Sequence, residues 1–142
     1  MARQEKKQAV SFRFDTGTVN RLKERSAEIG SSQGGLAERY IEEGLRMDDH
    51  SGIHFREGGS GRRPALTGTR LDVAEVIETL RQNDSSIGET ADYLDLSPAQ
   101  IEIALRYYTE YQSEVDHWIA QSRAIAERER ELATKRETAL AR

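Results

Sequence analysis

The most constraining feature of this chain is the stretch Gln8–Asp15, in which apolar and polar side chains alternate. The two sets are Val10, Phe12 and Phe14 on one side, and Ala9, Ser11 and Arg13 on the other. A period of two is typical of a strand with one apolar and one polar face. No second strand pattern follows nearby, so the backbone N–H and C=O groups of this strand would lack partners. Antiparallel pairing with the same strand of a second copy supplies them, which predicts a homodimer, or a higher even oligomer, built on a two-stranded ribbon.

Two helical patterns follow the strand and complete a first domain over residues 1–47. Asp15 is suited to cap the first helix, and Gly30 to end it in a left-handed conformation. Ser32 is suited to open the second helix, which carries an apolar stripe at helical spacing. We therefore assign dimerisation to the apolar side chains of the strand and of this stripe: Val10, Phe12, Phe14, Leu36, Tyr40 and Ile41.

The order strand, helix, Gly-Ser-Ser turn, helix resembles the ribbon-helix-helix family of DNA-binding proteins. The matching pieces are Val10–Asp15, Gly30–Ser32 and Leu36–Ile41. The resemblance implies that the ribbon of the dimer lies in the major groove of operator DNA. It also implies that the start of the second helix holds a phosphate.

Charge is distributed unevenly in a direction that agrees with this resemblance. The chain carries a formal charge of -4, yet basic residues crowd its start, which is typical of polyanion binding. Arg13 is able to donate two hydrogen bonds to a guanine edge. The predicted DNA-binding residues are Lys6, Lys7, Ala9, Ser11, Arg13, Ser32 and Gln33. The alternative is a ribbon that only dimerises, with Arg13 facing water.

Residues 48–62 are expected to be a linker with a hinge at Asp48–Gly52 and a glycine-rich loop at Arg56–Arg63. The loop lacks the lysine and hydroxyl spacing of a P-loop. His50 and His54 have no third ligand at useful spacing, so we expect neither a metal site nor a cofactor.

Residues 63–118 are expected to form a small helical domain with short β pieces. Pro64–Val73 is predicted to form two extended pieces around a glycine turn. Three helix starts follow, each with a predicted capping box, at Asp72, Ser86 and Ser97. The last two helices have helix-turn-helix spacing. Because Glu102 would be repelled by DNA phosphates, we assign this module to dimerisation or partner docking ahead of DNA binding.

The segments Gly61–Val73, Glu89–Leu94 and Ala104–Tyr108 are similar to the domain of unknown function numbered 433. The resemblance covers roughly residues 54–118. It implies a winged or helix-turn-helix module of bacterial antitoxins, which are often encoded beside a PIN-like ribonuclease toxin.

Residues 119–142 are expected to be a helical tail whose apolar stripe is interrupted by Glu129 and Arg136. The stripe either lies in a groove of a partner or belongs to a solvated helix, and beyond Ala133 we expect fraying. The predicted partner-binding residues are Trp118, Ile119, Ile125 and Leu132. For Trp118, packing inside its own protomer is the alternative.

The sequence thus predicts a mostly α-helical chain: a ribbon-helix-helix domain with an intermolecular ribbon, a helix-turn-helix-like domain and a long C-terminal helix. No arrangement of catalytic residues stands out, so we expect no enzyme. With no cysteine and no apolar run of membrane-spanning length, we expect a cytoplasmic protein. The predicted function is that of an antitoxin that binds operator DNA and neutralises a PIN-like nuclease toxin. The alternative is a stand-alone ribbon-helix-helix repressor without a toxin partner.

Overall fold

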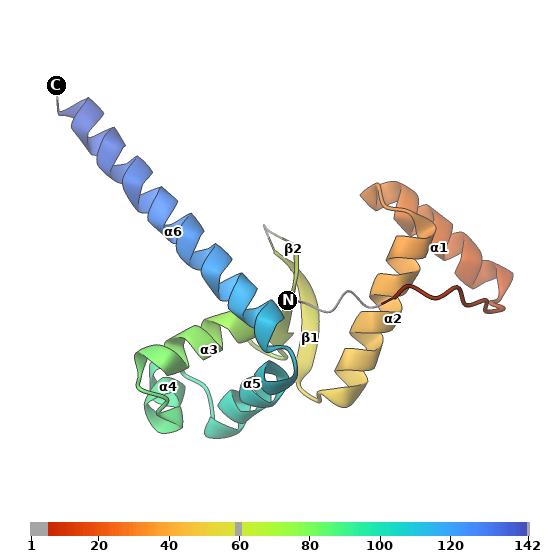
Figure 1. Ribbon diagram of the computed structural model, residues 1–142, viewed down its shortest axis with the longest axis horizontal. Helices are drawn as coiled ribbons and strands as arrows, with labels where there is room; N and C mark the ends of the chain where they lie inside the picture. The colour runs from red at the N-terminus through yellow and green to blue at the C-terminus, as the bar shows by residue number, and fades with distance from the viewer. Residues whose placement is uncertain (1–5, 59–60, 142) are drawn as a thin grey trace. The chain divides into compact units, whose positions relative to one another are not determined.

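The computed structural model describes residues 6–58 and 61–141, and these residues are mostly helical (Figure 1). They form six helices and one antiparallel hairpin in the middle of the chain, and the last helix is the longest. The chain divides into two compact units, residues 1–49 and residues 50–142. The predicted mostly α-helical class with short β pieces and a long C-terminal helix is therefore correct.

The first unit is built on a pair of helices, α1 (Thr16–Ile29) and α2 (Gln33–Asp49). Gly30 ends α1 as predicted, with a φ of 68° and its N–H donating to the carbonyl of Ser26. Asp15 occupies the N-cap position, but its side chain makes no capping hydrogen bond. Its backbone carbonyl instead accepts the N–H of Val19 at 3.1 Å, so the predicted side-chain cap is wrong.

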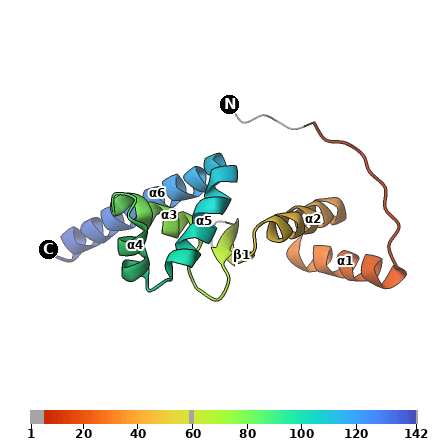
Figure 2. The same ribbon diagram turned by 90° about the horizontal axis from the view of Figure 1, so that it is seen from below.

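Residues 6–15, which lead into α1, form neither helix nor strand in the single chain. Figure 2 shows this segment running outside the helix pair. Among residues 6–58 and 61–141, the only hydrogen-bonded strands are those of the central hairpin. The predicted strand therefore has no pairing partner among these described residues, and an intermolecular ribbon stays a prediction.

The central hairpin consists of β1 (Ile53–Gly58) and β2 (Gly61–Leu66). It overturns the predicted linker and glycine-rich loop, because most of that segment is strand. Cross-strand pairs join Arg56 to Arg63, Glu57 to Arg62 and Gly58 to Gly61, so the glycines lie at the hairpin end. The predicted hinge is also shorter than expected, since α2 continues through Asp49 and the chain turns only at residues 50–52.

The two predicted extended pieces around Gly68 are present. Gly68 has a φ of 79°, the left-handed conformation that favours glycine. On either side of this turn, Ala65 and Asp72 form an isolated antiparallel bridge. The bridge leads the chain from β2 directly into the next helix.

Three short helices follow, α3 (Val73–Gln82), α4 (Ile87–Leu94) and α5 (Pro98–Glu110). Asp72 with Glu75, and Ser97 with Gln100, form complete capping boxes. Ser86 accepts the N–H of Glu89 but forms only this first bond of the predicted box. Residues 95–97 join α4 to α5, which is the spacing expected for a helix-turn-helix.

The hydrophobic core of the second unit lies where α3, α5, β2 and the start of the last helix meet. Its fully buried members include Leu66, Val73, Val76, Ile101, Ala104, Tyr107 and Val115. The last helix, α6 (Gln112–Leu140), contributes Val115 and Ile119 to this core. It then runs on beyond the other helices of its unit (Figures 1 and 2). Since α6 continues to Leu140, the predicted fraying beyond Ala133 is wrong.

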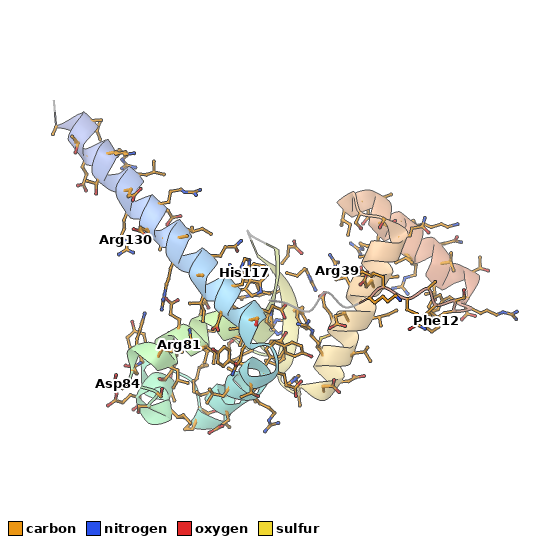
Figure 3. All side chains as sticks on the ribbon, in the orientation of Figure 1. Phe12, Arg39, Arg81, Asp84, His117 and Arg130 are labelled. Carbon is orange, nitrogen blue, oxygen red and sulfur yellow. The ribbon has the colours of Figure 1, made fainter. Side chains whose placement is uncertain are left out.

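A polar contact fixes the start of α6 against α3. Arg81 donates from Nη2 to Asp116 Oδ1 at 2.8 Å and also to the hydroxyl of Tyr108, which donates to the same carboxylate at 2.9 Å. Figure 3 shows Arg81 between α3 and α6. The hydrogen bond from Arg81 lowers the pKa of Asp116 below its usual 3.8, and the same contact raises the pKa of Arg81.

The lowered pKa of Asp116 predicts a pH-dependent contribution to stability. The carboxylate stabilises the folded state above the pKa of the unfolded chain, and this contribution is lost as the pH falls through the lower folded-state pKa. Because both side chains are partly exposed, Asp116→Asn should cost about 1 kcal/mol or less at pH 7. In thermal unfolding, the difference from the parent should shrink as the pH falls below 3.8 toward the lowered folded-state pKa of Asp116. Asp92→Asn, which changes an exposed side chain on α4, is the control at pH 7 and should change stability little. A deficit of Asp116→Asn that persists unchanged at pH 2 would contradict this account.

Candidate functional site

The extended segment before α1 keeps the two-residue alternation seen in the sequence. The ring centroids of Phe12 and Phe14 lie 6.0 Å apart, so these side chains fall on one side of the segment. Val10, Phe12 and Phe14 are 63%, 64% and 56% exposed. Phe12 lies beside the helix pair with its ring open to solvent (Figure 3). An apolar face of three large side chains is thus presented in a segment that has no strand partner.

A groove of about 500 Å³ lies next to this face, between α1 and α2. Its apolar lining is made by Phe14, Val19, Leu22, Ala37, Tyr40 and Ile41. Arg21, Arg25 and Glu28 contribute charged side chains to the lining. The groove therefore combines apolar walls with charges that suit contact with another polypeptide.

The predicted dimerisation residues separate into two groups. Val10, Phe12, Phe14, Tyr40 and Ile41 are all exposed in the single chain. Leu36 differs: it is only 2% exposed and is the one buried hydrophobic residue among those described in the first unit. Leu36 thus supports the fold of a single chain and is not available as a contact, which corrects its assignment to the dimer interface.

The predicted DNA-contacting side chains of the segment, Lys6, Lys7, Ala9, Ser11 and Arg13, are all exposed. Lys7 forms an ion pair with Glu38 of α2, with Nζ 2.5 Å from Oε1. Both partners are well exposed, so exchange of Glu38 for a phosphate would cost little.

The start of α2 carries the predicted phosphate contacts, Ser32 and Gln33. The Ser32 hydroxyl accepts the N–H of Gly35 at 3.0 Å, and its carbonyl accepts the N–H of Leu36 at 3.0 Å. The first N–H groups of a helix have no acceptor within the helix and lie at the positive end of its dipole. Apart from its chain neighbours and the adjacent backbone of its own helix, no atom lies within 4 Å of the point where a Cβ at Gly34 would stand, and residues 32–35 are exposed. The backbone at this helix start is therefore open to an approaching anion.

The predicted partner-binding residues of α6 also separate into two groups. Ile119 is 2% exposed and belongs to the core, so its assignment to a partner interface is wrong. Trp118 packs against the core of its own unit, and the guanidinium of Arg63 lies 4.8 Å from its ring centroid. Ile125 and Leu132 are 43% and 57% exposed. Only the last two are available to a partner.

Arg63 is a structural residue that the sequence did not single out. Its Nη1 donates to Asp72 Oδ2 at 3.2 Å and to Ser122 Oγ at 3.3 Å, and its side chain is 14% exposed. It thereby joins β2, the N-cap of α3 and α6. Burial is the main cause that raises the pKa of Glu75 in the adjacent capping box, and the charge of Asp72 adds to it. These partners are distant in sequence, so no local pattern reveals them.

The contacts of His50 are with carboxylate and aromatic side chains. His50 is 2% exposed, its Nε2 lies 3.2 Å from Glu110 Oε2, and its ring meets Tyr107 edge-on at 5.1 Å. In the part of the chain that the structure describes, no group of three or more His, Asp or Glu side chains is arranged to hold a metal ion. Nor does any helix within residues 6–58 and 61–141 combine the length and apolarity needed to span a membrane.

The second unit carries the one family match found for this chain. The family model described as "Protein of unknown function (DUF433)" matches residues 53–108, from β1 to α5. Residues 53–108 are a DUF433 domain. The resemblance noted from the sequence is thus confirmed for this segment. The match ends before α6, although Val115 and Ile119 of α6 complete the core of the DUF433 domain. No curated protein and no solved structure matches the chain.

The two neighbouring glycines at the start of α2 predict opposite effects of the same substitution. Gly34→Ala meets no atom and should stabilise the first unit by up to about 1 kcal/mol, since alanine favours the helix. At Gly35 the added Cβ would lie 2.9 Å from Ser32 Oγ and displace the capping hydroxyl. Gly35→Ala should therefore lose a cap worth about 0.5–2 kcal/mol and end no more stable than the parent. Thermal unfolding of both variants measures this, and equal stabilisation by both would contradict the capping role of Ser32.

Proposed function

We propose that this protein is a homodimeric antitoxin that binds operator DNA through its first unit and neutralises a PIN-like nuclease toxin through its second. In this proposal, residues 8–14 of two chains pair as an antiparallel ribbon of the ribbon-helix-helix type. The ribbon enters the major groove, and the DUF433 domain with α6 forms the partner-binding half.

The main support for the proposed dimer is the exposure of apolar side chains in the first unit. Among its described residues only Leu36 is a buried hydrophobic residue. The exposed large apolar side chains of this unit are Val10, Phe12, Phe14, Ile29, Tyr40, Ile41, Leu45 and Met47. Burying one such side chain stabilises a fold by about 1.5–3 kcal/mol, so a unit of this kind gains most of its stability from a partner. A second copy fits best, because it also supplies the missing strand.

Support for DNA as the ligand comes from the polar side of the same segment. Ser11 and Arg13 alternate with Phe12 and Phe14 along the sequence and are exposed. A two-stranded ribbon fits the major groove, and arginine pairs with guanine through two hydrogen bonds. The open helix start at Ser32 and Gln33 suits a backbone phosphate, which would fix the position of the ribbon on the duplex.

Support for a protein partner comes from α6. Its first turns are held by the core and by Arg63 and Arg81, whereas every described residue from Arg123 onward is exposed. Figure 3 shows Arg130 on this projecting part of the helix. Ile125 and Leu132 stand one heptad apart and provide an apolar stripe for a groove on a toxin.

The proposed dimer can be tested by replacing the apolar side chains of the segment before α1. Replacing both Phe12 and Phe14 by Ser removes about 1.5–3 kcal/mol of burial per side chain and should convert the dimer to a monomer with a disordered first unit. Light scattering measures the mass, and a gel shift with the DNA upstream of the protein's own reading frame measures binding. Both the dimer and the gel shift should be lost.

Ala9→Ser is the matched control, because it changes the polar side of the same segment. It should remain dimeric. A folded monomer that still shifts DNA after the double change would refute the ribbon.

The proposed partner-binding half can be tested separately from DNA binding, in cells that express the toxin encoded by the adjacent reading frame. Ile125→Glu together with Leu132→Glu should abolish growth rescue, since two charges replace the apolar stripe, while dimerisation and DNA binding persist. Buried anchors of this kind commonly contribute about 2 kcal/mol or more each to an interface.

Thr134→Glu is the control for added charge, because residue 134 lies about half a turn away from residue 125 around the helix. It should rescue growth like the parent. Rescue by the double variant would remove α6 from the toxin interface. A neighbouring frame without any nuclease would favour the stand-alone repressor.

A further inference from the structure

We infer that the exposed part of α6 pairs with the same helix of a second copy of the chain. The two helices run antiparallel, in a register that sets Glu129 of each chain against Arg136 of the other. This inference rests on the proposed homodimer, but it depends neither on DNA binding nor on a toxin. The face concerned is the one that the proposed function assigns to a toxin, so a bound toxin would replace the second copy there.

One face of α6 carries both apolar and charged side chains. Beyond the core of its unit the helix projects (Figures 1 and 2), and Ile125, Leu132 and Leu140 are 43%, 57% and 76% exposed. Glu129 and Arg136 lie between them at steps of three or four residues, so all five side chains share one side of the helix. Two opposite charges, two turns apart, therefore interrupt an exposed apolar face.

These two charges have no partner of opposite sign on their own helix. Side chains of one helix pair at a spacing of three or four residues. At that spacing, the neighbours of both Glu129 and Arg136 are Ile, Leu or Ala only. Both side chains are exposed, and neither forms an ion pair within residues 6–58 and 61–141. Both charges are therefore available to a second chain.

The signs of the two charges select the direction and the register of the pair. Two parallel helices in register would set Glu129 against Glu129 and Arg136 against Arg136, and both contacts are repulsive. An antiparallel pair centred between residues 132 and 133 instead sets Glu129 against Arg136 of the other copy, twice. A shift by one helical turn in either direction would place each charge against apolar side chains. Polar groups within an apolar seam fix the register of paired helices in this way.

The same register matches the apolar side chains. Ile125 lies level with Leu140 of the other copy, and the two Leu132 side chains meet at the centre. The core of the second unit is left intact, because every described residue from Arg123 onward is exposed and Ile119 is the last core residue of α6. The partner helix ends at Leu140 and so runs only beside the projecting part. No contact of the single chain has to be broken.

The pair is small and depends on the proposed homodimer for its stability. Each chain contributes three large apolar side chains and two exposed charges, and an exposed ion pair contributes little by itself. A dimer held by its first unit carries two copies of α6 in one complex. Their effective concentration is then on the order of millimolar, which a weak pairing of helices requires.

The direction and register are tested by cross-linking the full-length protein, which contains no natural cysteine. With a short bismaleimide, Ala133→Cys should link to its own copy in high yield. Ile125→Cys and Leu140→Cys should each link poorly alone, because identical residues then lie about 22 Å apart along the helices. The two variants should link efficiently when they are co-expressed. Thr134→Cys, on the opposite side of the helix, is the control and should link poorly.

The role of the charges is tested in the Ala133→Cys protein. Glu129→Arg alone and Arg136→Glu alone each set like charges against each other twice, so the initial rate of cross-linking should fall by about tenfold. The double exchange restores opposite charges and should restore the rate. Arg130→Glu makes the same change of charge about 140° around the helix from Ile125 and should leave the rate unchanged.

The outcomes separate this inference from the homodimer on which it rests. Efficient self-linking of Ile125→Cys would show a parallel pair and overturn the inference. A double exchange that stays as slow as the single variants would overturn the register. If light scattering finds a dimer but Ala133→Cys does not link, the inference fails and the homodimer stands. If the parent protein is a monomer, both fail.

Discussion

The first unit depends on apolar surface that one chain cannot bury. A helix pair with a single buried hydrophobic residue lacks the core that a unit of this size requires to fold. Most of its exposed large apolar side chains lie on the segment before α1 and on α2, and three of them, Phe14, Tyr40 and Ile41, line the groove between α1 and α2. The same segment carries unpaired backbone groups. In the proposed dimer, a second copy of the chain covers the apolar face and also completes the backbone pairing, which an unrelated protein would have to match separately.

The second unit buries its apolar side chains and pairs its charged groups within one chain. Its core joins residues from β1 to α6, and the charged side chains around it are paired across elements. Arg63 connects the hairpin to α3 and α6, and Arg81 connects α3 to α6. The core of the second unit therefore includes two turns of α6 that lie beyond the family match. The two units thus differ, because the second buries its apolar side chains in a shared core and the first leaves most of its large apolar side chains exposed.

Local patterns predicted much of the fold. Gly30, Ser32 and the capping boxes at Asp72 and Ser97 are short-range signals, and the helices begin and end where these residues indicate. The hairpin was missed because its strands, Ile53–Gly58 and Gly61–Leu66, show no sustained two-residue alternation, and because its glycines resemble those of a flexible loop. The burial of Ile119 was not predictable from spacing along α6, whereas the packing of Trp118 within its own chain was one of the two predicted alternatives. Which side of a helix meets the core depends on the placement of the other helices. The contact of Arg63 with Trp118 joins residues that are far apart in sequence, so no local pattern indicates it.

The projecting part of α6 fixes the distance between the apolar side chains that a partner would contact. From Arg123 to Leu140 the helix is about 27 Å long, comparable to the diameter of a small domain. Ile125 and Leu132 are held about 10 Å apart along the axis by the helix itself. A partner that receives both side chains must offer two apolar depressions at that distance, with charged groups between them that tolerate Glu129 and Arg128. The helix therefore restricts its partners by the spacing of their pockets as well as by their chemistry, and a surface with one deep pocket does not fit it.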